Sequence, residues 1–265
     1  MMKKDEFYIG YIDNVPPKTK KKLKITVYIL LIVVILFAIV FSLFQNKFKN
    51  STFELTNISE ITGTYHNNPY PSIRMELQPN EYKNVLLLGF GKFGAEKDIK
   101  NIENRLMSIE GQEVSIKGNL VYYNGKTLLQ VADSDEFPVS KKESQLPERT
   151  INSLGEIEIE GEIIDPKCYF GVMKPGFGKI HRSCAVRCIS GGIPPVFTTV
   201  NKEGISEYFM ITDAKGNKIN HDILEYVGQP VKVKGELEQL DNWFILKLNI
   251  EDIKLLKGNS KIYSN

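Results

Sequence analysis

A run of twenty uncharged residues from Ile25 to Phe44 constrains this chain more than any other feature. At a rise of 1.5 Å per residue, a helix of this length covers about 30 Å, the thickness of the hydrocarbon layer of a membrane. A buried core helix is a weaker interpretation, because the run is too long and too uniformly apolar. A signal peptide fits less well, because its apolar region is shorter and ends in small residues. The sequence therefore predicts a transmembrane helix over residues 25–44.

Lysines are concentrated on the amino side of this run. Five of them lie between Lys18 and Lys24, and only Lys47 and Lys49 lie close to its other end. Because Lys and Arg accumulate on the cytoplasmic side of a span, residues 1–24 are expected to form a short cytoplasmic tail. The remainder of the chain then lies outside the cytoplasmic membrane, in contact with the lipid bilayer through a single span.

Two segments after the span, residues 50–139 and 153–258, each contain a series of short strands separated by turns. In both, the predicted order is three strands, a helix or helical turn, and two more strands. A polar, turn-rich stretch over residues 140–152 is expected to link them. The stretch Gly111–Gly118 is similar to Gly228–Gly235, and both precede a turn and a final strand, which indicates a duplicated fold.

This order of elements is typical of the OB-fold, a small five-stranded Greek-key barrel. The predicted fold class is therefore mainly β, with one N-terminal transmembrane helix followed by two OB-fold-like five-stranded β-barrels. Two unrelated β-sandwiches are the alternative.

Charge and motifs exclude several classes of function. The net charge is +2, but the lysine-rich residues 1–24 account for +4, so the rest of the chain is slightly acidic and lacks the basic surface of a nucleic-acid-binding protein.

Residues 89–94 fit the pattern G-x-G-x-x-G of dinucleotide-binding turns. A nucleotide is nevertheless disfavoured, because the hairpin signal around Asn124-Gly125 indicates an antiparallel sheet in place of parallel βαβ units. Hydrolase motifs with supporting context are absent, so hydrolase chemistry has no specific support in the sequence.

All three cysteines lie within residues 165–195, an insertion between the first two strands of the second barrel. Glycine and proline predict a loop in its first half, whereas residues 180–190 contain no helix breaker and predict a helix. On that helix His181, Cys184 and Cys188 fall on one face, and Cys168 is available from the loop. One imidazole and three thiolates form a ligand set suited to zinc, and the same ligands bind iron or copper. The sequence predicts a metal site at these four residues.

Two alternatives remain open for the same segment. Outside the membrane, Cys168 could be joined to Cys184 or Cys188 by a structural disulfide. A bond between Cys184 and Cys188 is less favourable, because residues one helical turn apart are separated by more than a disulfide allows. Alternatively, two of the cysteines could cycle between thiol and disulfide, since Lys179 and neighbouring arginines would favour a thiolate.

The Cys/His segment follows the pattern C-Y…G-K-x-H-x-x-C-A-x-x-C…G-x-P, carried by Cys168-Tyr169, Gly178-Lys179, His181, Cys184-Ala185 and Cys188. It resembles a segment of uncharacterised bacterial proteins that are exported or anchored by a single span. The resemblance implies a membrane location and a shared site, and it supplies no reaction. An N-terminal anchor with an exported OB-fold also resembles the haem chaperone of cytochrome c maturation, but His221 and Tyr226 do not match its H-x-x-x-Y pattern.

These features together predict a membrane-anchored binding or accessory protein outside the cytoplasm. It would hold a metal or a metal cofactor and serve a membrane protein partner.

Overall fold

The computed structural model describes residues 15–44, 51–133, 139–201 and 203–257. The chain divides into two compact units, residues 1–49 and 50–265. Most of the expected tail, residues 1–14, lies outside the described residues, as do Lys47 and Lys49.

The described part of the first unit is a single helix, α1 (Pro17–Phe44), with a mean hydropathy of 3.2 over its most apolar window and no buried residue. A core helix of a soluble protein would be mostly buried, so this helix suits a membrane span or a signal sequence. It begins eight residues before the predicted start, because Pro17 is favourable at the first helical position and the lysines that follow are good helix formers.

The first barrel consists of β2 (Ser59–His66), β3 (Ser72–Gln78), β4 (Glu81–Leu88), α2 (Glu96–Leu106), β5 (Gln112–Tyr123) and β6 (Lys126–Val131). The barrel closes because β2 pairs with both β3 and β5, while β6 pairs with both β4 and β5. Two short strands, β1 (Thr52–Phe53) and β7 (Ser140–Glu143), extend the sheet along β5.

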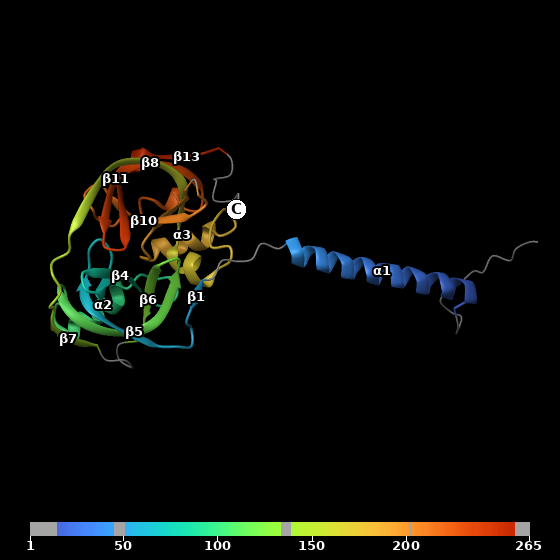
Figure 1. Cartoon of the computed structure of the whole chain (residues 1–265), viewed down its shortest axis with the longest axis horizontal. Helices are drawn as coiled ribbons and strands as arrows, with labels where there is room; N and C mark the ends of the chain where they lie inside the picture. The colour runs from blue at the N-terminus through green and yellow to red at the C-terminus, as the bar shows by residue number, and fades with distance from the viewer. Residues whose placement is uncertain (1–14, 45–50, 134–138, 202, 258–265) are drawn as a thin grey trace, which may run out of the picture. The chain divides into compact units, whose positions relative to one another are not determined.

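The second barrel repeats this connectivity with β8 (Ile151–Ile164), β9 (Val196–Val200), β10 (Ser206–Asp213), η2 (Leu224–Tyr226), β11 (Pro230–Leu240) and β12 (Trp243–Leu248). Again the first strand pairs with the second and fourth, and the fifth pairs with the third and fourth. A 3-10 turn, η3 (Ile250–Asp252), leads into β13 (Ile253–Leu255), which pairs with β11. The predicted fold of two five-stranded barrels is confirmed, and Figure 1 shows the strands of each gathered around their own centre.

The repeated Gly-x6-Gly stretch has the same structural role in both barrels. Gly111 and Gly228 adopt positive φ, +70° and +67°, in the turns that enter β5 and β11. A Cβ atom on Gly118 would collide with the carbonyl of Gln130, and one on Gly235 with that of Lys247, each on the neighbouring last strand. Glycine is therefore required where the fourth strand bends from the first strand to the fifth to close each barrel.

The stretch predicted as a linker is more ordered than its composition suggests. Residues 140–143 form β7 on the edge of the first barrel, and residues 151–152 already belong to β8. Pairing with β5 explains this difference, since the edge of a long strand offers hydrogen bonds to a polar segment that has little strand signal of its own.

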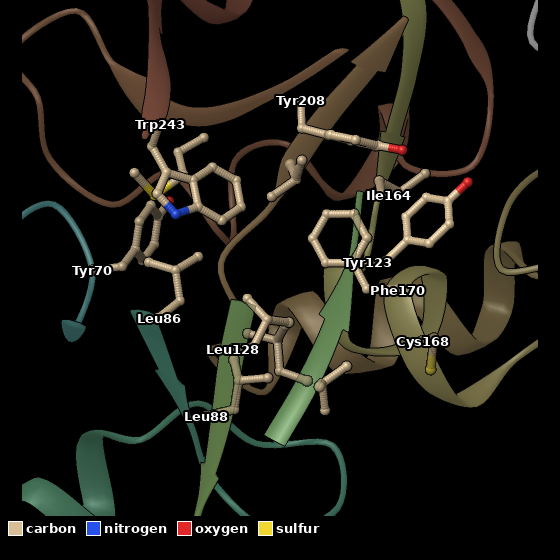
Figure 2. Packing of buried hydrophobic residues seen from close by; sticks show 14 of the residues in the cluster. Tyr70, Leu86, Leu88, Tyr123, Leu128, Ile164, Cys168, Phe170, Tyr208 and Trp243 are labelled. Atoms are coloured by element: carbon tan, nitrogen blue, oxygen red, sulfur yellow. The ribbon is translucent and has the colours of Figure 1, made fainter. Parts of the chain in front are cut away.

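The two barrels share an apolar core. On β4, Val85 and Leu87 point into the first barrel, whereas Leu86 and Leu88 pack in a second cluster with Trp243 and other residues of the second barrel. Figure 2 shows this cluster, in which Tyr70, Leu86, Leu88 and Leu128 face Ile164, Tyr208 and Trp243. Buried hydrogen bonds join the barrels as well: the Tyr70 hydroxyl donates to the Ile211 carbonyl (2.8 Å), and the Trp243 indole donates to the Asn84 carbonyl (3.1 Å). Residues 50–265 are therefore packed as one unit.

Candidate metal site

The Cys/His insertion joins β8 to β9, as predicted, and contains two helical elements. Cys168 opens η1 (Cys168–Val172), a single π-helical turn, whereas the sequence predicted only a loop there. Cys184 and Cys188 lie on α3 (Arg182–Ser190), which matches the predicted helix, and His181 is its N-cap residue. In barrel one the equivalent connection between β2 and β3 is only five residues long.

The insertion is fastened to its barrel by buried polar contacts. The Glu162 carboxylate, at the end of β8, accepts a hydrogen bond from the backbone N–H of Gly178 (2.5 Å). The Asn220 side chain donates to the carbonyls of Ile189 (2.9 Å) and Ile193 (2.8 Å) at the end of α3. These bonds hold the loop before α3 and the chain at its carboxyl end, and so they fix the position of the helix.

The three thiols come together, as the sequence predicted. The sulfur atoms of Cys168, Cys184 and Cys188 all lie within 4.8 Å of one another. Cys168 and Cys188 are buried, Cys184 is half-buried, and all three are free of disulfide bonds. The cluster thus combines thiols from two elements that are separated in the sequence but fixed by the same barrel.

His181 belongs to a second group. One of its ring nitrogens, the sulfur of Cys168 and a carboxylate oxygen of Asp165 lie within 4.8 Å of one another. Asp165 was not predicted as a site residue. It immediately follows the buried end of β8 and is itself fully buried. An aspartate after the apolar pair Ile163-Ile164 and three residues before Cys168 is the sequence signal that could have indicated it. The structure therefore places His181 with Asp165 and Cys168, not in the group of three sulfurs.

Two polar atoms of this second group are buried without a hydrogen-bond partner among the described residues, His181 Nε2 and Asp165 Oδ2. The other carboxylate oxygen of Asp165 accepts from the backbone N–H of Lys167 (2.9 Å). Buried polar groups are normally paired, because leaving one unpaired costs about 1–3 kcal/mol. A buried imidazole nitrogen and a buried carboxylate oxygen without partners, on residues whose ligand atoms lie within 4.8 Å of each other, are suited to a cation.

The electrostatic setting favours a neutral imidazole at His181 and a protonated thiol at Cys168 when no cation is bound. Burial lowers the pKa of His181, with a smaller contribution from Lys92, and the carboxylate of Asp165 opposes this shift. A hydrogen bond with Cys188, burial and the charge of Asp165 all raise the pKa of the Cys168 thiol. Neutral imidazole is the form of histidine that ligates metals, whereas a thiol must lose its proton to do so.

The glycine loop of the first barrel, residues 89–94, contacts the insertion at Lys167 and Gly191. The buried ammonium of Lys167 donates to the carbonyls of Gly89 (2.9 Å) and Gly91 (2.8 Å), and burial lowers the pKa of this lysine. The Gly94 N–H donates to the carbonyl of Gly191, just after α3 (3.0 Å). Side chains at Gly94 or Gly191 would collide with backbone atoms across this contact. Of the glycines in the G-x-G-x-x-G pattern, Gly94 therefore has a packing role between the barrels.

The other two histidines lie apart from the cluster. A ring nitrogen of His66, Nδ1, lies 3.4 Å from a carboxylate oxygen of Glu110, and His221 is exposed.

Beside α3, an open groove of about 1120 Å³ lies between the insertion and the segment around η2. The residues that line it include Phe177, Ile180, Arg182, Val186 and Leu224.

Comparison with known proteins gives no family for this chain: no model of a protein family matches it, and no curated protein is significantly similar to it.

Proposed function

We propose that this chain is a membrane-anchored accessory protein, with its two barrels outside the cytoplasm, that binds metal at Cys168, Cys184, Cys188 and His181 and serves a membrane protein complex. The helix α1 supports the anchor, since its exposed apolar surface requires a membrane or another apolar environment. The lysines on its amino side support the orientation. The resemblance to exported and single-span bacterial proteins agrees with this location.

The single observation that carries the metal proposal is the convergence of three thiols beside a buried imidazole nitrogen that has no hydrogen-bond partner in the described part of the chain. Sulfur and imidazole ligands select zinc, iron or copper over magnesium or calcium, which prefer oxygen ligands.

A thiol redox protein is the second candidate, because the thiols of Cys168 and Cys188 already contact each other and a small movement would bring the sulfurs to bonding distance. The raised pKa of Cys168 counts against it, since a reactive thiol needs a lowered pKa. A structural disulfide is the third reading, and it would require Cys168 to be bonded to one of the helix cysteines.

The deciding experiment is elemental analysis of the full-length protein, purified in detergent under reducing conditions, combined with thermal unfolding before and after addition of Zn²⁺, Fe²⁺ or Cu⁺. We expect bound metal and a rise in Tm that Cys188→Ser abolishes, while the control His221→Gln retains both. Absence of metal and of any stabilisation would refute the proposal. Rapid alkylation of one cysteine near neutral pH would instead favour the redox protein, and a native disulfide in protein isolated without reductant would favour the structural reading.

A further inference from the structure

The ligand atoms of the cluster form two groups of three that share one sulfur. Cys168, Cys184 and Cys188 make one group, and Cys168, His181 and Asp165 make the other, each within 4.8 Å. The five residues do not form one group at this distance. Cys168 is thus placed between two sets of potential ligands.

Coordination geometry argues against a single ion for both groups. Around one tetrahedral ion with bonds of about 2.0–2.3 Å, neighbouring ligand atoms are about 3.3–3.8 Å apart. Each group of three needs only a small contraction to reach this spacing. Gathering all five atoms around one ion would need larger movements of α3. Asn220 and the glycine loop fix the carboxyl end of this helix, and the bond at Gly178 fixes the loop before it.

The charge of the cluster permits a second ion. With metal bound, the three thiolates and the carboxylate of Asp165 carry four negative charges, in a site where Asp165, Cys168, Cys188 and His181 are all buried. Uncompensated charge in such a place is costly. With the buried Lys167 ammonium counted, one divalent ion leaves a net charge of −1 and two leave +1, so the choice between one ion and two rests on the coordination geometry.

We propose that the cluster binds two divalent metal ions of the zinc type, bridged by the thiolate of Cys168. The first ion takes Cys184 and Cys188 as its other ligands, and the second takes Asp165 and His181. This inference rests on the proposed metal-binding function and adds Asp165 and a second ion to it. The two unpaired acceptors, His181 Nε2 and Asp165 Oδ2, are then paired by the second ion. Their oxygen and nitrogen donors suit a divalent ion better than Cu⁺.

The test is the stoichiometry of Zn²⁺ in the full-length reduced protein, measured by titration and by elemental analysis after gel filtration. We expect two ions per chain in the unaltered protein and one in Asp165→Asn or His181→Gln. Asp165→Asn keeps an oxygen that can accept the Lys167 N–H, so the turn before η1 is retained. Asp222→Asn and His221→Gln change exposed residues of the same types and should still bind two ions.

Each outcome decides a separate point. One ion per chain in the unaltered protein would refute the paired site and leave the proposed function intact. Two ions in the unaltered protein and also in both Asp165→Asn and His181→Gln would place the second ion elsewhere and refute the assignment. No bound ion would refute the proposed function itself. The first measurement needs no variant, so a variant that fails to fold does not prevent the decision.

Discussion

Gly191 lies where the two barrels meet at the candidate site, and its replacement by alanine tests how tightly the site depends on that contact. Gly191 has φ of −81° and ψ of 0°, a conformation that alanine adopts without backbone strain. The effect of Gly191→Ala is therefore steric. The added Cβ would lie well inside 3.0 Å of the Lys92 carbonyl oxygen, closer than Cβ atoms approach backbone in folded proteins.

Relief of this collision requires the glycine loop and α3 to separate by about 1 Å, an overpacking defect that costs about 1–3 kcal/mol. The same separation breaks the hydrogen bond from the Gly94 N–H to the Gly191 carbonyl, worth about 1 kcal/mol. We therefore expect Gly191→Ala to lower the free energy of unfolding by about 2–4 kcal/mol.

The only tryptophan of the chain provides the assay. Trp243 is fully buried in the core between the barrels, so its fluorescence reports the loss of that core during urea unfolding. Ser190→Ala is the control, since Ser190 donates only to the Arg187 carbonyl of its own helix and its loss should change stability by less than about 0.5 kcal/mol. If Gly191→Ala is as stable as this control, the inference that the glycine loop packs closely against α3 is refuted.

Three further predictions concern the barrels and the topology. Burial and Lys83 lower the pKa of Lys126 from 10.5 to about 8; between these two pH values Lys126 binds more protons in the unfolded chain, so the contribution of Lys126 to stability should rise with pH by about 1–3 kcal/mol. In urea unfolding at pH 8 and 10.5, Lys126→Met should lose this rise, and an unchanged slope would contradict the prediction. In the same assay, Asp241→Ala should lower the free energy of unfolding by about 3 kcal/mol or more, because it removes the carboxylate that lies 3.0 Å from the buried guanidinium of Arg74. A loss below about 1 kcal/mol would show that the pair is solvated. A membrane-impermeant thiol reagent should label the half-buried Cys184 in intact cells, after mild reduction if it is paired, and labelling only after lysis would show that the barrels face the cytoplasm.

The sequence predicts the elements of this fold well because each has a local signal. The uniform apolar run marks α1, alternating apolar residues mark the strands, and the recurring glycines mark the position where each barrel closes. The location of the insertion and the extent of α3 follow from the Gly-Gly and Pro-Pro pairs after Ser190. The membrane orientation, the domain boundaries and the resemblance to exported bacterial proteins stay predictions.

What the sequence does not predict depends on contacts between distant residues. The run of apolar residues in β4 indicates a buried strand, but it cannot show that Leu86 and Leu88 face a second barrel. For the same reason the sequence groups His181 with the cysteines of its own helix, while the structure pairs it with Asp165 from the end of β8. Helical spacing places two side chains on one face, but it does not set which neighbour from another element they meet.

The candidate site depends on contacts from both barrels. The second barrel supplies all five potential ligands, and the first supplies the carbonyls of Gly89 and Gly91 that hold the buried Lys167 ammonium next to Cys168. Without those carbonyls, the ammonium would be left without its hydrogen bonds in an apolar setting, at a cost of several kcal/mol. The positions of the potential ligands around Cys168 therefore depend on both barrels. The apolar core around Trp243 fixes the two barrels against each other. One barrel thus carries the insertion, while the other has a short connection at the equivalent place and supplies the surface against which the insertion packs.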